Sequence, residues 1–267
     1  MKLSGITRFP IKSCRGIEVS RAHVERRGIA HDRRWMIVDP EGRFVTQREE
    51  ARLALVDVAL EDDRLRLGAP DASPIEIPTR LDVGARATVT VWRSTVEAIA
   101  HADASAWMSA HLGRTVRVVY MPDDVRRAVN EKYAHPGDVV SFADGYPLLL
   151  ATRESLADLE ARAGTSLEMR RFRPNVVIEG APAWAEDGWS RLRIGRIVFR
   201  APKPCDRCVI TTIDPATAIA GKEPLRTLAK FRRTADGKVL FGVNLIPELD
   251  DHESIEISIG DEVEILA

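Results

Sequence analysis

The sequence contains few cysteines and no long apolar run. Three of its 267 residues are cysteine, which is too few, and odd in number, for the disulfide framework of a small secreted protein. Met1 is followed at once by Lys2, and no apolar leader begins the chain. No stretch approaches the roughly 18 apolar residues of a membrane-spanning helix. We therefore expect a cytoplasmic protein in a reducing compartment, with no membrane as partner.

The sequence also lacks an excess of charge and the glycine-rich motifs of nucleotide-binding proteins. Its 39 lysines and arginines nearly balance its 40 aspartates and glutamates, so no long-range field favours a nucleic-acid polymer as partner. Neither G-x-x-x-x-G-K-[ST] nor G-x-G-x-x-G occurs, which argues against P-loop and dinucleotide sites. The plant-type C-x4-C-x2-C spacing is absent as well, so we expect no ferredoxin cluster in the chain itself.

Short segments with β-strand character dominate the sequence. Strands are predicted at residues 1–9, 17–24, 34–38, 44–47, 55–60, 64–67, 88–92, 95–99, 116–120, 176–178, 192–194, 197–199, 209–213, 231–234, 238–241, 255–259 and 263–265. Two helices are predicted, at 103–112 with Asp103 as N-cap and at 152–163 with Thr152 as N-cap. Gly113 and Gly164 should end them. Many short strands with few helices predict a mainly β fold of the α+β class that contains a closed or partly closed barrel.

Residues 122–137 have mixed charge, and their apolar residues follow no regular helix or strand spacing. We therefore predict a loop there, with at most one turn of helix. We expect it to separate an N-terminal domain, residues 1–121, from a C-terminal domain, residues 122–267. Each half is long enough to bury a core of its own.

Two of the three cysteines lie together, as Cys205 and Cys208, behind Pro202 and Pro204. The prolines favour extended backbone, and the β-branched run after Cys208 predicts a strand at 209–213. The neighbouring Arg207 favours the thiolate, which is the form that attacks electrophiles and binds metals. A lone C-x-x-C is also compatible with simple packing, because zinc sites and thioredoxin-like dithiols need a context that is missing here.

Other segments supply polar groups that suit an anion or a heterocycle. Arg173 offers a planar fork that matches phosphate, and Asn175 can both donate and accept. Further donors are Lys12 and Ser13 near the start of the chain, and Arg33 beside Asp32. The plainer alternatives are a solvated basic loop with a turn asparagine, and an exposed ion pair of little energy. The short segment Asp144-Gly145-Tyr146-Pro147 is predicted to be a turn. Its glycine has no side chain and would let a ligand approach the backbone closely.

Five motifs in order resemble a known family. They are Lys12-Ser13-Cys14-Arg15-Gly16, Asp32-Arg33 before Trp35, Phe172-Arg173-Pro174-Asn175, Cys205-x-x-Cys208 followed by Thr211-Thr212-x-Asp214-Pro215, and Lys222-Glu223-Pro224-Leu225. Together they resemble MOSC-domain proteins, in particular the mitochondrial amidoxime-reducing component and its bacterial YcbX-like relatives. The resemblance covers nearly the whole chain.

The resemblance implies a MOSC β-barrel domain preceded by a β-rich MOSC N-terminal domain, with a molybdenum cofactor, the molybdopterin type, between them. By position, Cys208 would ligate the molybdenum and be the catalytic residue, and a soft thiolate suits such a metal. The resemblance places the cofactor-binding positions at Lys12, Ser13, Arg33, Asp144, Gly145, Tyr146, Arg173, Asn175, Cys205 and Asp206.

The implied function is reduction of small N-hydroxylated compounds, namely hydroxylamines, amidoximes or N-hydroxylated bases. Because no ferredoxin domain follows Ala267, we expect a separate electron-donor protein of the ferredoxin, flavoprotein or cytochrome type. Gly145 and Tyr146 replace small hydroxyl residues of the mitochondrial relatives, and Asn244 replaces a tyrosine. Two alternatives are a cofactor carrier without turnover and a sulfur-transfer protein that carries a persulfide on Cys205 or Cys208.

Overall fold

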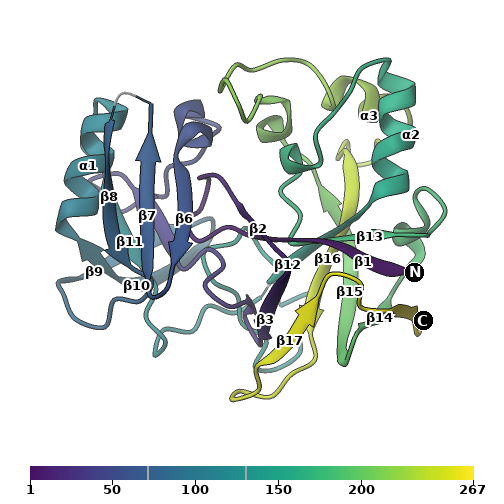
Figure 1. Ribbon diagram of the computed structural model, residues 1–267, viewed down its shortest axis with the longest axis horizontal. Coiled ribbons are helices and arrows are strands. Elements are labelled where there is room, and N and C mark those ends of the chain that lie inside the picture. Colours follow the sequence, from purple (N-terminus) through teal and green to yellow (C-terminus); the bar gives the residue numbers. More distant parts are fainter. Residues whose placement is uncertain (71, 130) are drawn as a thin grey trace.

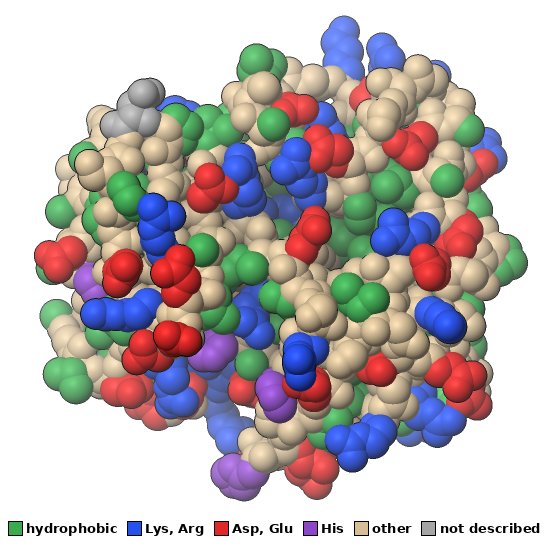
Figure 2. Space-filling view, viewed as in Figure 1, with side chains coloured by type: hydrophobic (Ala, Val, Ile, Leu, Met, Phe, Trp, Pro, Cys, Tyr) green, Lys and Arg blue, Asp and Glu red, His purple; other side chains and the backbone are tan. Residues whose placement is uncertain are grey.

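The computed structural model describes residues 1–267 except residues 71 and 130. The fold is mainly β with three α-helices in the described part of the chain, which confirms the predicted class. Figure 1 shows two groups of elements side by side, joined across the middle by the strand β2 (Ile17–Val19). No helix among the described residues is long and apolar enough to cross a bilayer. Figure 2 shows acidic and basic side chains interspersed over this face of the molecule.

The largest sheet of the described residues has eight strands and closes into a barrel. Its order is β18 (Val263–Ile265), β14 (Arg191–Ile194), β15 (Ile197–Asp206), β16 (Leu240–Pro247), β12 (Leu148–Thr152), β13 (Val176–Glu179), β1 (Lys2–Arg8) and β2. Closure comes from Leu3 N, which donates to Asp261 O at 2.9 Å, and Val263 N, which donates to Met1 O at 3.0 Å. The predicted barrel is therefore present, without a free edge between β1 and β18.

Helices cover one side of the barrel. The helix α2 (Arg153–Ala163) begins where the Thr152 hydroxyl accepts from Ser155 N and ends at Gly164, whose φ is 66°. Both predicted caps are therefore confirmed. The short helix α3 (Leu225–Phe231) packs beside α2. Because the barrel interior lies on one face and these helices on the other, every residue of β12 is buried.

The N-terminal half has a core of its own. One sheet has the order β5 (Trp35–Val38), β11 (Arg117–Tyr120), β10 (Ser94–His101) and β9 (Arg86–Val91). A second has β6 (Asp57–Glu61), β7 (Arg64–Ala69) and β8 (Ala72–Pro78), and the helix α1 (Ala102–Leu112) packs against both. Fully buried side chains such as Trp35, Leu65 and Met108 fill the space between them.

Two strands among the first 29 residues, β1 and β3, pair with strands of the other half. β1 runs antiparallel to β13, and a small sheet joins β17 (Ile255–Ser258), β3 (Arg21–Glu25) and β4 (Gly28–Ile29). Residues 9–14 and 30–34 then run between the two halves, where Lys12 N donates to Trp35 O at 2.8 Å. The division into domains at residues 121 and 122 stays a prediction, and the crossing segments carry several of the predicted site residues.

The predicted strand at 209–213 is wrong, and this changes how the cysteines are presented. The strand β15 includes both prolines and Cys205 and ends before Cys208, and residues Val209–Thr212 form a 3₁₀ turn. The hydroxyl of Thr211 donates to Cys208 O at 3.0 Å, and that of Thr212 donates to Val209 O at 2.7 Å. These local bonds stabilise the turn and outweigh the β preference of branched residues.

Other boundaries also differ from the prediction. His101 caps α1, because its Nδ1 accepts from Ala104 N at 3.3 Å, while the expected end at Gly113 is confirmed. Residues 44–47, predicted as a strand, form only a single bridge at Phe44. The predicted strand at 17–24 is split into β2 and β3. The predicted strand at 231–234 is wrong at its first residue, because Phe231 is the last residue of α3. The predicted loop at 122–137 contains no regular helix or strand among its described residues, and residue 130 lies outside them.

Phe199→Ala is expected to lower the free energy of unfolding by about 3–5 kcal/mol, because Phe199 is fully buried in the barrel core and its removal leaves a cavity. Denaturant unfolding followed by far-ultraviolet circular dichroism measures the loss. Val83→Ala is the matched control, because Val83 is 84% exposed and should change stability by about 0.5 kcal/mol at most. Equal effects of the two variants would contradict the barrel core.

Candidate functional site

A cavity of about 390 Å³ lies between the barrel and the N-terminal half. All the residues proposed from the resemblance line it, although they come from five separate segments of the chain: Lys12, Ser13, Arg33, Asp144, Gly145, Tyr146, Arg173, Asn175, Cys205, Asp206 and Cys208. The crossing segments supply the first three and the loop before β12 the next three. Arg173 and Asn175 come from the segment before β13, Cys205 and Asp206 from the end of β15, and Cys208 from just after it. The fold therefore brings the whole predicted set together.

The carboxylate of Asp32 anchors one wall of the cavity. It is 2% exposed and accepts from Phe9 N at 2.8 Å, Asn175 Nδ2 at 3.0 Å and Arg33 Nη1 at 2.7 Å. The pair of Asp32 and Arg33 is thus buried, in contrast to the exposed ion pair considered as an alternative. Arg33 is held with its guanidinium 4.4 Å from the centre of the Phe9 ring.

The side chain of Asn175 is fully used within the protein. Its Oδ1 accepts from Arg33 Nη1 at 2.8 Å and from Leu149 N at 3.2 Å. Its Nδ2 donates to Asp32 and to Thr7 O, at 3.0 and 3.2 Å. An amide has two donor hydrogens and two acceptor positions, so Asn175 serves in this arrangement to fix Arg33.

Lys12 is the most deeply buried of the candidate cations. Its Nζ donates to Phe142 O at 2.8 Å and forms an ion pair with Asp144. Burial lowers the pKa of Lys12 to about 8, although Asp144 opposes the shift. Loss of hydration would raise the pKa of Asp144, but Lys12 and then Arg48 hold it well below its usual range. Both groups are therefore charged at pH 7.

Three of the candidate residues have strained backbone. Ser13, Arg33 and Arg173 have φ values of 70°, 47° and 56°, in the left-handed region that residues other than glycine rarely adopt. Such conformations cost on the order of 1–3 kcal/mol each and gather at binding and active sites. Because all three face one cavity, the strain supports a shared binding role for them.

The guanidinium of Arg173 has one N–H group for which the described structure provides no hydrogen-bond acceptor. Its Nη1 donates to Cys14 O at 2.7 Å, whereas its Nη2 is buried with no hydrogen-bond partner in the described structure. Burial, and then the nearby charge of Arg33, lower the pKa of Arg173, although a guanidinium stays charged in proteins. A buried cation with an unused donor favours binding of an anion. The phosphate of a pterin cofactor fits this donor set.

Two sulfurs line the cavity, each beside its own arginine. Sγ of Cys208 accepts from Arg48 Nη2 at 3.3 Å, and Sγ of Cys205 accepts from Arg207 Nη1 at 3.0 Å. Both cysteines are partly exposed and unpaired, whereas Cys14 is buried and burial raises the pKa of its thiol to about 12. Cys205 and Cys208 are therefore the thiols suited to a ligand role.

The described residues do not by themselves provide a complete metal site. Among the described residues, no group of three or more histidine, cysteine, aspartate or glutamate side chains could hold a metal ion. A metal at Cys208 would therefore take its other ligands from a cofactor. The predicted molybdenum cofactor, which brings sulfur ligands, is compatible with a site of this kind.

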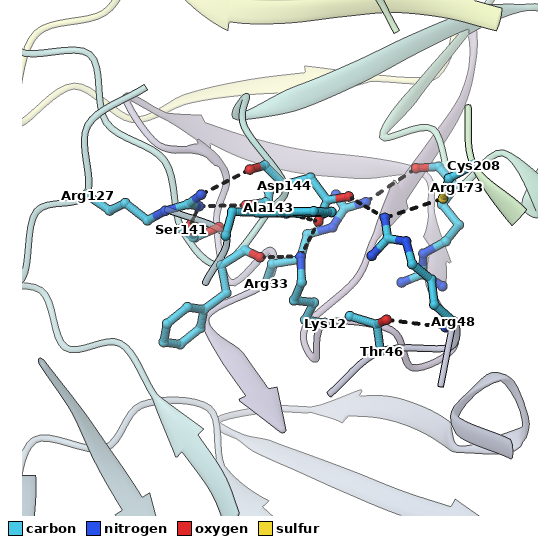
Figure 3. A network of polar contacts seen from close by, with 12 residues as sticks. Lys12, Arg33, Thr46, Arg48, Arg127, Ser141, Ala143, Asp144, Arg173 and Cys208 are labelled. Carbon is cyan, nitrogen blue, oxygen red and sulfur yellow. Dashed lines mark hydrogen bonds and ion pairs between the residues drawn. The ribbon is translucent and has the colours of Figure 1, made fainter. Parts of the chain in front are cut away.

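Several cavity residues were not predicted from the sequence. Arg48 and Trp92 come from the N-terminal half and line the cavity. Arg127 does not line it, but braces the opposite wall by donating to the carbonyls of Ser141 and Ala143 at 2.8 and 2.6 Å. Figure 3 shows Arg48 between Cys208 and Asp144, with Arg127 on the far side of Asp144. Arg48 and Trp92 belong to no recognisable motif, and only the tertiary structure brings them to the cavity.

The comparisons with known proteins match both halves of the chain. The family described as "MOSC N-terminal beta barrel domain" matches residues 1–115, and the "MOSC domain" matches residues 137–264. Mitochondrial amidoxime-reducing component 1 of Mus musculus is 34% identical over 239 residues, covering 84% of this chain and 69% of the relative. The same protein of Homo sapiens and component 2 of Rattus norvegicus are each 33% identical, covering 84% of this chain and 70% of each relative.

The chain belongs to the MOSC family.

This MOSC protein has three cavity residues at which the resemblance implies a departure from the relatives, namely Gly145, Tyr146 and Asn244. A side chain at Gly145 would meet no atom within 4 Å, so the glycine leaves open space there. Burial raises the pKa of the Tyr146 hydroxyl, which is therefore neutral. Asn244 Nδ2 is within 3.3 Å of Lys203 O and 3.4 Å of Pro204 O, and these bonds brace the extended segment before the cysteines.

Binding of sulfate to the cofactor-free protein is expected to weaken as the pH rises through about 8, because Lys12 then loses its proton and its charge. Sulfate keeps its own charge over this range. Between pH 7 and 9.5 we expect a loss of about tenfold, measured by isothermal titration calorimetry.

Lys12→Arg should remove most of this dependence, since guanidinium stays charged. Lys222→Met is the control, because Lys222 is exposed and lies outside the cavity. An equal pH dependence in the Lys12→Arg variant would show that Lys12 is not the titrating group.

Proposed function

We propose that this MOSC protein is a molybdenum-cofactor-dependent reductase of small N-hydroxylated compounds: hydroxylamines, amidoximes and N-hydroxylated bases. The observation that carries the proposal is one cavity in which a partly exposed sulfur, Cys208, lies with buried cations from distant segments. The relatives named as amidoxime-reducing components support the reaction class. The reaction consumes two electrons and two protons and converts R–NH–OH into R–NH₂ and water.

The chain's own residues would divide the binding of the cofactor among them. The thiolate of Cys208 would ligate the metal, and Lys12, Arg33 and Arg173 would bind the anionic end through charge-assisted hydrogen bonds. Ser13, Gly145, Tyr146, Cys205 and Asp206 would contribute contacts along the wall. When bound, the cofactor supplies the two-electron chemistry, while the protein orients the substrate and tunes the site.

The charges of the cavity fit such a ligand. Lys203 and Arg207 add to the cations named above, while Asp144 and Asp206 oppose them. Asp32 already neutralises part of the Arg33 charge. The positive excess that remains would stabilise a phosphate within a partly desolvated site. We further propose that the electrons come from a separate redox protein and that the protein works in the cytoplasm, where its unpaired thiols stay reduced.

A sulfur-transfer or cofactor-carrier role is the second candidate. It is favoured by the contact of Cys205 with Arg207, which gives the cavity a second sulfur beside a cation. Such a partly exposed, unpaired sulfur could carry a persulfide. Mass spectrometry of the purified protein for one extra sulfur atom would detect it.

Cys208→Ala is expected to abolish molybdenum retention and reductase activity in protein purified from a host that makes the cofactor, because the metal loses its protein ligand. Cys205→Ala is the matched control and should keep most of the molybdenum. Metal analysis and benzamidoxime reduction with a chemical electron donor measure the two effects. Molybdenum-free wild-type protein from such a host, or equal molybdenum in both variants, would contradict the proposed ligand.

A further inference from the structure

Arg48 lies beside the sulfur proposed to ligate the metal. Its Nη2 is 3.3 Å from Sγ of Cys208 and 3.5 Å from Oδ2 of Asp144, and its side chain is 24% exposed. In Figure 3 the guanidinium lies between these two groups and lines the same cavity. The N-terminal half thus places a positive, planar donor at the proposed reaction centre.

The backbone around Arg48 is fixed before any ligand binds. Arg48 N donates to the Thr46 hydroxyl at 3.2 Å, and Thr46 O accepts from Glu49 N and Glu50 N, at 3.0 and 2.9 Å. Gln47 Nε2 donates to Ser13 O at 2.5 Å, which ties this turn to the wall that carries Lys12. Arg48 is therefore held on a rigid turn, as electrostatic stabilisation of a transition state requires.

Trp92 holds the guanidinium in place from the cavity rim. The Arg48 guanidinium lies 4.8 Å from the centre of the Trp92 ring, and Trp92 Nε1 donates to Asp144 Oδ1 at 3.1 Å. Trp92 is 46% exposed and has a φ of 55° in the turn between β9 and β10, where glycine would be easier to place. Trp92 also packs against Phe44, with the ring centres 5.1 Å apart, and strained backbone at a cavity residue that contacts Arg48 and Asp144 supports a role in the site.

Several other cations of the cavity are engaged elsewhere. Lys12 donates to Phe142 O and pairs with Asp144, Arg33 pairs with Asp32, and Arg207 donates to Cys205 Sγ and Phe172 O. Among the described residues, Arg48 is the cation whose hydrogen bond reaches Sγ of Cys208. A substrate bound at a metal on that sulfur would therefore lie within reach of Arg48.

We propose that Arg48 stabilises the oxygen that leaves when the N–O bond of the substrate is cleaved, and that Trp92 is a positioning residue for Arg48. This inference rests on the proposed function. Two electrons from the donor protein enter through the cofactor, the N–O bond breaks, one proton goes to nitrogen and one to oxygen, and amine and water leave. Negative charge grows on the oxygen during this step, so a fixed guanidinium stabilises the transition state more than the bound substrate.

The test uses the molybdenum-loaded enzyme with reduced methyl viologen as electron donor and benzamidoxime as substrate. Arg48→Gln should lower kcat by about 10²-fold with KM changed by no more than about threefold, because the lost interaction belongs to the transition state. Arg48→Lys, which keeps the charge, should recover part of the rate. The molybdenum content of both variants should equal that of the wild type.

Trp92→Gly should lower kcat by about tenfold at unchanged molybdenum content, because Arg48 is no longer held. Glycine suits the backbone at this position, so the variant should fold, with an unfolding midpoint within about 4 °C of the wild type. Arg93→Gly is the matched control: the same substitution in the same turn, at an exposed residue outside the cavity. It should leave kcat and KM unchanged.

Three outcomes would overturn the assignment, and they are distinguishable. If Arg48→Gln keeps kcat within about twofold while the wild type is active, Arg48 has no role in the step. If Arg48→Gln loses molybdenum but keeps its rate per bound metal, Arg48 holds the cofactor instead. If fully loaded wild-type enzyme reduces no N-hydroxylated compound, the proposed function itself fails, and the role of Arg48 fails with it.

Discussion

The site depends on two carboxylates, the buried Asp32 and the more exposed Asp144, that hold cations close together. Asp32 fixes Arg33 from within the protein, and Asp144 binds Lys12 on one side and Arg48 on the other. Without these anions, like charges from distant segments would repel one another in a partly desolvated cavity. Because the carboxylates offset only part of the charge, the cations stay assembled and still favour an anionic ligand. The arrangement is preorganised rather than formed by the ligand.

The path of the chain explains how one cavity can draw on both halves. β1 completes the barrel, and the chain then crosses to the N-terminal half with Lys12 and Ser13 on the crossing segment. It crosses again near Arg33, between the sheet that holds β3 and the strand β5. The cofactor proposed for the cavity would therefore bind where the two cores meet, on backbone whose strain at Ser13, Arg33 and Arg173 both cores maintain.

The cysteine segment shows where local rules succeed and where they fail. Pro202 and Pro204 restrict the backbone, and the segment is extended as the sequence predicts. The residues after Cys208 prefer strands by composition, yet the hydroxyls of Thr211 and Thr212 bond back to nearby carbonyls and form a turn. Propensity scales average over contexts and do not contain this competition. The sulfur is therefore presented at the end of a strand rather than at its beginning.

The sequence by itself determined the class of fold, the capped helix α2, and the segments that supply the cavity, because strand periodicity, caps and ordered motifs are local signals. Tertiary structure alone decided that Asp32 is buried and that the Asn175 amide uses its hydrogen-bonding groups within the protein to hold Arg33. It also decided that Arg48 contacts Cys208 and that Trp92 packs against Arg48. The physical reason is that burial and hydrogen-bond saturation depend on contacts between residues far apart in the chain. No short motif encodes such contacts.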